Sequence, residues 1–189
     1  MDRLFFHLEQ MTRLRTRGEA EVALLVALHD LLDLRGASFH RLFMPPGDIL
    51  VGLIAHVDDA GVERHGDDMA WADDPVSIEC RPHLQACLAS HGASHDHAGG
   101  HARLTLPVPS SGTPFGFVTL ESAQPLAADD PVIGGLIAVF DSHRRLLDYA
   151  EVDTLTGLLN RKTFDESVLH ILSRLDVASD VESGALHLP

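Results

Sequence analysis

The sequence has few of the features that mark secreted, membrane-spanning or nucleic-acid-binding proteins. It contains two cysteines, too few for a framework of disulfides, which fits a reducing compartment. No apolar run approaches the roughly 18 to 20 residues that span a bilayer, and the N-terminus lacks the pattern of a signal peptide. The 14 basic residues against 28 acidic ones give a charge of −14, which disfavours binding to phosphate backbones or anionic lipid. We therefore expect a cytoplasmic protein with no nucleic-acid and no membrane partner.

Apolar residues make up 45% of the 189 residues, enough for the core of one ordinary domain. Residues 2–34 have helical periodicity, with a break expected near Gly18 and an end at Gly36. Further along the chain, alternating apolar residues and turn residues predict two hairpins, a partly helical middle, a loop and a long helix. These elements are expected at residues 37–44 with 49–57, 102–108 with 115–121, 75–90, 91–100 and from residue 131 onwards.

This order of elements resembles a GAF domain, a small ligand-binding sensor. The sequence Leu106-Pro107-Val108-Pro109, followed by Gly116-Phe117-Val118-Thr119-Leu120, is similar to the last two strands of that family. The resemblance implies an α+β fold, with an antiparallel sheet packed against long N- and C-terminal helices. A PAS domain is the nearest alternative, but its helix order usually differs.

An unknown small-molecule effector is implied by the same resemblance. We expect its pocket between the sheet and the irregular segment 58–100. The candidate lining residues are Phe39, His56, Trp71 and Phe117, several of which could equally belong to the core.

The expected helix 131–152 carries apolar residues at heptad spacing. One stripe consists of Ile133, Leu136, Phe140, His143, Leu147 and Ala150, and a parallel one of Val132, Leu136, Val139, Leu146 and Ala150. One stripe can pack on the domain's own sheet while the other meets a second chain, although a simple core helix has the same pattern. We predict a homodimer formed through residues 131–152 and the N-terminal helix.

Residues 153–164 read Asp-Thr-Leu-Thr-Gly-Leu-Leu-Asn-Arg-Lys-Thr-Phe. This run resembles the opening D-x-L-T-G-L-x-N-R-x-x-F of the GGDEF domain of bacterial diguanylate cyclases. The matching residues are Asp153, Leu155, Thr156, Gly157, Leu158, Asn160, Arg161 and Phe164. Because these residues open the domain, the resemblance implies a structural and linking role for them. A generic connection between a loop and a helix is the alternative.

Diguanylate cyclases, as a family, join two GTP molecules into cyclic di-GMP with the help of Mg²⁺. Residues 153–189 are expected to be only the start of such a domain, because they contain no Gly-Gly-Asp/Glu-Glu-Phe sequence. We therefore expect no catalytic residue and no cofactor in this chain, and assign GTP and Mg²⁺ to a longer parent protein. The expected domains are an N-terminal helix (1–18), a GAF-like sensor (19–130), a signalling helix (131–152) and this start (153–189).

The expected function is the sensory and dimerisation region of a diguanylate cyclase. Two alternatives remain open. The chain can be a dimerisation scaffold without a ligand, or it can regulate a degenerate GGDEF domain that acts as a nucleotide receptor.

Histidines cluster in the expected loop, at His91, His95, His97 and His101. Imidazoles at this spacing can bind zinc, nickel or copper, but an incidental polar loop is the favoured interpretation. Cys80 and Cys87 would share one face of a continuous helix, where core packing is favoured over a redox, haem or metal role.

Overall fold

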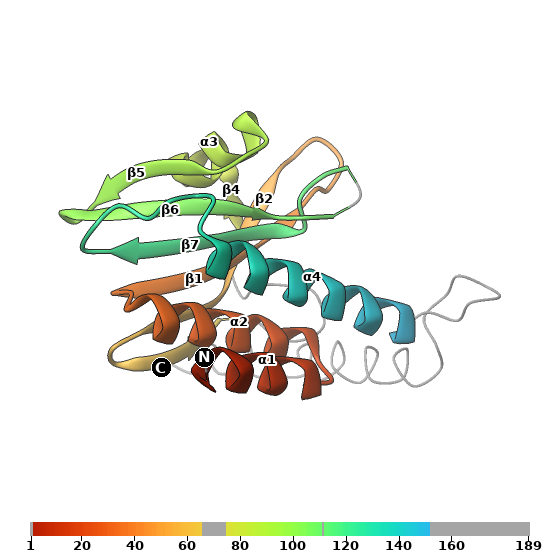
Figure 1. Cartoon of the computed structure of the whole chain (residues 1–189). Helices are drawn as coiled ribbons and strands as arrows, with labels where there is room; N and C mark the ends of the chain where they lie inside the picture. The colour runs from red at the N-terminus through yellow and green to blue at the C-terminus, as the bar shows by residue number, and fades with distance from the viewer. Residues whose placement is uncertain (1, 66–74, 111, 152–189) are drawn as a thin grey trace, which may run out of the picture. The chain divides into compact units, whose positions relative to one another are not determined.

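The computed structural model describes residues 2–65, 75–110 and 112–151 (Figure 1). Trp71 and the motif at 153–164 lie outside these ranges. The chain divides into two units, Met1–Arg145 and Leu146–Pro189. All contacts described here lie within the first unit.

The helices and strands follow the predicted order, with short additions. The helices are α1 (Asp2–Arg13), α2 (Arg17–Leu32), the 3₁₀ turn η1 (Ile78–Cys80), α3 (Pro82–Ser90) and α4 (Pro131–Glu151). The strands are β1 (Gly36–Phe43), β2 (Leu50–Asp58), β3 (Gly61–Arg64), β4 (Val76–Ser77), β5 (Ser94–Ala98), β6 (His101–Val108) and β7 (Gly116–Ser122).

The seven strands form one antiparallel sheet in the order β3-β2-β1-β7-β6-β5, with β4 paired to β2. Both predicted hairpins are present, β1 with β2 and β6 with β7, and β1 joins them by pairing with β7 at the centre. Helices pack on the sheet, so the predicted α+β class with an antiparallel sheet is confirmed.

The break between the two N-terminal helices was predicted near Gly18. In the structure it lies at residues 14–16. Thr16 is the N-cap of α2, and its hydroxyl accepts a hydrogen bond from the backbone N–H of Glu19 at 3.3 Å. Gly18 is buried inside the first turn of α2. The helix ends at Asp33, which adopts the left-handed conformation with φ of 51°, while Gly36 begins β1. A capping hydroxyl and a left-handed aspartate therefore set these ends.

Helices α2 and α4 cover one face of the sheet, which we call the helical face; it carries Ala37, Phe39, Val118 and Leu120. Phe39 meets Phe140 of α4 with 5.6 Å between ring centroids. Ile133 and Leu136 are buried with Phe140, so the first predicted stripe packs into the chain's own core over these residues. The structure thereby removes them from a dimer seam.

One ion pair is buried on the helical face. Arg41 of β1 donates from Nε and Nη2 to the two carboxylate oxygens of Glu21 in α2, at 2.7 and 2.8 Å. The side chains are 4% and 0% exposed, so the bidentate geometry compensates for the removal of both charges from water. The pair fixes α2 to the sheet.

The segment 91–100 was predicted as a loop, which is wrong for Ser94–Ala98. These residues form the edge strand β5 and pair with β6. The composition of this segment did not indicate a strand, because an edge strand needs few apolar residues. His95 and His97 are both exposed. Across the pair, Asp96 accepts hydrogen bonds from the Arg103 guanidinium, which stabilises the register.

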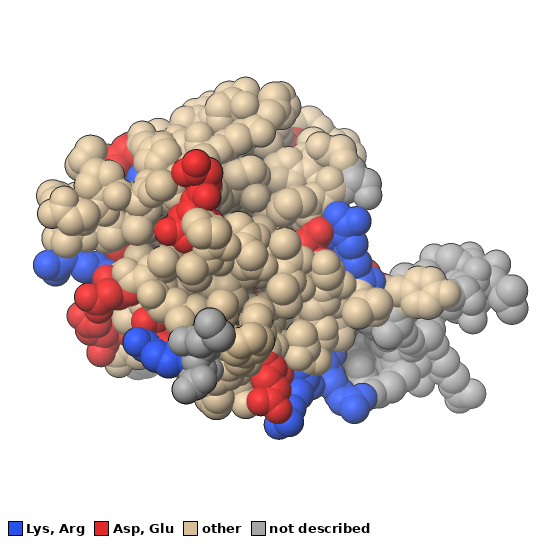
Figure 2. All heavy atoms as spheres, viewed as in Figure 1, with Lys and Arg blue, Asp and Glu red and all other residues tan. Residues whose placement is uncertain are grey.

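The surface seen in Figure 2 is largely uncharged. Acidic and basic side chains lie near one another at its left and lower edges, and a further acidic group lies in its upper middle. Among the described residues, no helix is long and apolar enough to cross a membrane.

Candidate effector site

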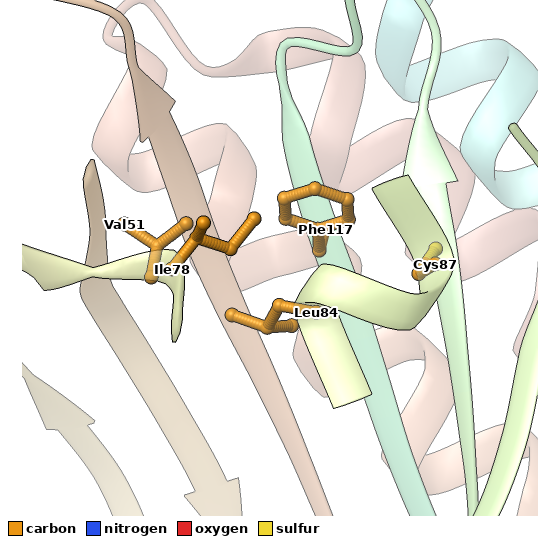
Figure 3. Close-up of a cluster of buried hydrophobic side chains, with 5 residues drawn as sticks. All are labelled: Val51, Ile78, Leu84, Cys87 and Phe117. Carbon is orange, nitrogen blue, oxygen red and sulfur yellow. The ribbon is translucent and has the colours of Figure 1, made fainter. Parts of the chain in front are cut away.

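The opposite face of the sheet, which we call the α3 face, is covered by η1 and α3. Here Phe117 of β7 packs with Val51, Ile78, Leu84 and Cys87 (Figure 3). Pro82 opens α3 at a position that needs no backbone N–H donor, which lets the short helix begin directly after η1. The cluster holds α3 close to the centre of the sheet.

A row of polar residues crosses five strands on this face. The cross-strand partners are His56, Ser38, Thr119, Thr105 and Ser94, on β2, β1, β7, β6 and β5. Partners in an antiparallel sheet point to the same side, and Thr119 lies two residues from Phe117, so the row faces α3. The Ser38 hydroxyl and Nδ1 of His56 lie 2.9 Å apart and form a hydrogen bond.

The middle of the α3 face contains buried polar atoms that have no hydrogen-bond partner among the described residues. They are Oγ1 of Thr105, Oγ1 of Thr119 and Nδ1 of His40. The three residues are 1%, 4% and 7% exposed. A buried polar group without a partner costs about 1–3 kcal/mol, so three of them in adjacent strands are costly for stability alone. Such groups are suited to bind the polar atoms of a ligand.

Two imidazoles adjoin this row. The ring of His40 meets that of His83 in α3 edge to face, with 6.3 Å between centroids. Burial, assisted by the charges of His83, Arg81 and His56, lowers the pKa of His40 to about 3. Burial and then Arg103 lower the pKa of His83 to about 4. Both rings are therefore neutral at pH 7, and each can donate one hydrogen bond and accept another.

Two charged residues of the same face, Arg103 and Asp96, are paired with each other. Arg103 donates from Nε to Oδ1 of Asp96 at 2.6 Å, and this bond lowers the pKa of Asp96. The arrangement offers hydroxyls and neutral imidazoles beside the apolar ring of Phe117. It is suited to an uncharged molecule that has both hydrogen-bonding and apolar parts.

A hollow of about 260 Å³ adjoins the site at the C-terminal end of α3, and Cys87, Leu88, His91 and Pro107 contribute to its lining. Pro107 is the cross-strand partner of Phe117, and the Cys87 thiol lies 3.7 Å from the carbonyl oxygen of Thr105. The hollow therefore borders the polar row. Its volume is slightly below the roughly 300–1,000 Å³ typical of ligand pockets, which favours a small molecule.

The predicted pocket residues are divided between the two faces. His56 and Phe117 lie on the α3 face, whereas Phe39 lies on the helical face against Phe140. Phe39 therefore belongs to the core and not to the site, because it occupies the opposite position of the strand alternation. The sequence prediction missed His40, Thr105 and Thr119. Their signal was present as Ser-x-His at residues 38–40 and as Thr-Leu at residues 105–106 and 119–120, where polar side chains fall on the face that was expected to be buried.

The four histidines considered as metal ligands are spread over three elements. His91 ends α3 with φ of 53°, His95 and His97 lie on β5, and His101 begins β6. Nε2 of His95 is 3.1 Å from the carbonyl oxygen of Leu126. Within residues 2–65, 75–110 and 112–151, no group of three or more His, Cys, Asp or Glu side chains is placed to hold a metal ion.

The two cysteines have different surroundings. Cys80 is exposed at the end of η1, and Cys87 is buried in α3, so the segment is not one continuous helix. Burial raises the pKa of the Cys87 thiol to about 11, which leaves it protonated and unreactive at pH 7. Its Sγ donates to the carbonyl oxygen of Gly92 at 3.1 Å, in keeping with a packing role.

The connection between β6 and β7 links the hollow to α4. Pro109 contributes to the 260 Å³ hollow and also to a second one along α4, and its carbonyl oxygen accepts a hydrogen bond from Arg144 at 3.4 Å. The Arg144 guanidinium lies 4.5 Å from the ring centroid of Phe115 and donates to Asp141 at 2.6 Å. Contacts at this junction therefore join the rim of the site to the helix that leads towards residue 153.

Solved structures similar to this chain share its GAF-like fold. A GAF domain of an Acinetobacter phosphoenolpyruvate-protein phosphotransferase has a TM-score of 0.53 at 10% identity, over 79% of this chain and 92% of that one. Residues 122 to 287 of a methyl-accepting chemotaxis protein have a TM-score of 0.62 at 10% identity, over 79% and 99%. A free methionine-R-sulfoxide reductase from Neisseria meningitidis, in complex with its substrate, has a TM-score of 0.57 at 14% identity, over 78% and 89%. No protein-family profile and no curated protein sequence matches the chain.

Proposed function

We propose that this chain is the sensory and dimerisation region of a diguanylate cyclase, with a GAF-like sensor at residues 19–130, a signalling helix at 131–152 and the start of a GGDEF domain at 153–189. The observation that carries the proposal is the motif at 153–164, which follows directly after α4 (Pro131–Glu151). The GAF-like fold, shared with a domain of a phosphotransferase and with part of a methyl-accepting chemotaxis protein, supports a regulatory role. We also infer that the chain works in the cytoplasm, where GTP and reduced thiols are found.

The effector is proposed to bind on the α3 face. Unpartnered atoms of His40, Thr105 and Thr119 support this location, and the pairing of Arg103 with Asp96 favours an uncharged ligand. Binding there replaces missing hydrogen bonds, so the ligand should stabilise the folded chain by an amount that rises with the logarithm of one plus its concentration divided by its dissociation constant.

Signal transfer is proposed to pass through the β6–β7 connection. A ligand that fills the hollow contacts Pro109, whose carbonyl oxygen bonds Arg144 of α4. A small displacement of this connection changes the position of α4 relative to the sheet. In a dimer, such a shift aligns or separates two downstream catalytic domains, each of which holds one GTP.

The test uses the longer protein that continues past Pro189, incubated with GTP and Mg²⁺, with the 189-residue chain as the control. Cyclic di-GMP from the longer protein alone is the expected result. Product from neither protein, also in the presence of effector candidates, would favour the scaffold or the receptor alternative. In an active protein, Arg144→Gln should reduce the effect of an effector on the rate by at least about 5-fold, the lower end of typical allosteric coupling, and leave effector binding intact.

Effector binding is tested on the 189-residue chain by thermal shift with a panel of small uncharged metabolites. A compound that stabilises the wild type but not Thr119→Val would support the α3 face. The control is Thr12→Val, an exposed threonine of α1 outside both the polar row and the lining of the hollow. Stabilisation that is equal in all three proteins would place the ligand elsewhere.

A further inference from the structure

The outer surface of α1 exposes two adjacent aromatic rings. Phe5 is 62% exposed and Phe6 is 56% exposed, whereas Met11 on the inner side of the same helix is fully buried. The other large apolar side chains found exposed in the described residues are scattered, except for Leu146 and Tyr149 in the last turns of α4. Contiguous exposed aromatics usually mark an interaction surface.

Two hollows flank Phe6. One of about 600 Å³ lies towards β2 and is lined in part by Val26 and Val57. The other, of about 330 Å³, is lined in part by Leu14, Val22 and Val26. Together they form a groove along α1 and α2, which we call the α1–α2 groove. The ring of Phe6 therefore lies between two hollows on one surface, as a self-complementary contact requires.

The charges around the groove cancel. Arg3 pairs with Asp30 across α1 and α2, and the pKa of Asp30 is lowered to about 2 by Arg3 and His7, so the pair stays charged and closed near pH 7. Glu9 pairs with Arg13 one turn later. The charged residues that line the second hollow, Glu19 and Arg64, are also of opposite sign.

This local neutrality decides the kind of partner. The chain carries a net charge of −14, so two copies repel each other over most of their surface, and phosphate-rich partners are repelled as well. Repulsion is weakest where acidic and basic side chains are paired, as in Arg3–Asp30 and Arg13–Glu9. A neutral apolar groove with projecting rings favours a second copy of the same neutral surface.

We propose that two copies of the chain pair through the α1–α2 groove, with Phe5 and Phe6 of one copy packing into the groove of the other. The contact is isologous, so both copies contribute the same surface and every contact occurs twice in the interface. Helix α1 has 12 residues and a length of about 18 Å, and the proposed contact consists of two α1–α2 pairs; a stable dimer buries about 800 Å² per copy. The proposal localises the dimer on which the proposed function rests.

The experiment measures the mass of the 189-residue chain by sedimentation over a range of concentrations. The wild type should be a dimer, and Phe5→Ser/Phe6→Ser should raise the dissociation constant at least about 100-fold, since buried aromatic anchors dominate such contacts. The comparison variant is Leu146→Ser/Tyr149→Ser, which removes the exposed apolar residues of α4. Leu146 lies in the second stripe predicted to meet another chain, so an intact dimer in this variant places the contact at the α1–α2 groove and not at residues 131–152. Circular dichroism confirms that each variant is folded.

Hydrogen exchange gives an independent measurement on the unmodified chain. Amides of α1 and the first half of α2 should exchange more slowly above the dissociation constant than below it. A monomeric wild type, or a dimer lost in the α4 variant and retained in the α1 variant, overturns the proposal. Neither result depends on cyclic di-GMP formation by the longer protein, so failure of the groove and failure of the cyclase assignment are told apart.

Discussion

The two faces of the sheet are built from alternate residues of the same strands, yet they differ in whether their buried polar groups have partners. On the helical face, Ala37, Phe39, Val118 and Leu120 are apolar and buried, and the buried charge of Arg41 is matched by Glu21. On the α3 face, the intervening residues include Ser38, His40 and Thr119, and two of these three keep a polar atom without a partner in the described chain. The contrast separates a surface that stabilises the fold from one whose buried polar atoms are suited to bind a ligand.

The largest expected effect comes from breaking the buried ion pair on the helical face. Arg41→Met should destabilise the chain by about 3–5 kcal/mol, because Glu21 would remain as a buried charge without its bidentate partner. The double variant Glu21→Leu/Arg41→Met should recover much of this loss. Urea unfolding measures both. Equal losses in the single and double variants would show that the pair is held by something other than mutual neutralisation.

The alternation of faces was readable from the sequence only in part. Both hairpins and the α+β class could be predicted, because strands flanked by turn residues and helices with apolar stripes depend on local patterns. The central pairing of β1 with β7 joins residues about 80 positions apart and has no local signal. Without it, Phe39 and Phe117 could not be assigned to different faces.

The edge strand β5 and the polar row show a second limit. An edge strand needs few apolar residues, so its Ser, His and Asp composition has the signature of a loop. Thr105 and Thr119 have good strand propensity whether or not their hydroxyls are paired, so propensity could not distinguish a functional threonine from a structural one. Only the register across β6 and β7 places the two side by side.

The α3 face should respond to substitution in the opposite direction from the helical face. Thr105→Val/Thr119→Val keeps the side-chain shape and removes two buried hydroxyls without partners, so we expect stabilisation of about 1–3 kcal/mol in urea unfolding. Ser38→Ala is the control, since its hydroxyl is paired with His56 and its loss should destabilise. Destabilisation by the double valine variant would mean that the hydroxyls are paired in solution.

The smallest expected effect is a pH dependence carried by His40. Its pKa is lowered from 6.5 to about 3 by burial, with His83, Arg81 and His56 as the charged or titratable neighbours that add to the shift. The unfolded chain therefore binds a proton at His40 between pH 6.5 and 3 and the folded chain does not. The contribution of neutral His40 to the free energy of unfolding is therefore fully present above pH 6.5 and is lost as the pH falls. For this group alone the loss between pH 6 and 5 is about 1 kcal/mol.

His40→Leu removes the titrating group and one unpartnered nitrogen together. The variant should be at least as stable as the wild type at pH 7, and its stability should fall less steeply between pH 6 and 5, by about 1 kcal/mol. His83→Leu should change the slope by a similar amount in this window, since the pKa of His83, lowered to about 4, also lies well below pH 5. An unchanged slope in His40→Leu would show that the ring is hydrated in solution. In that case the α3 face would be as accessible to water as to a ligand, and the contrast with the dry helical face would be sharper still.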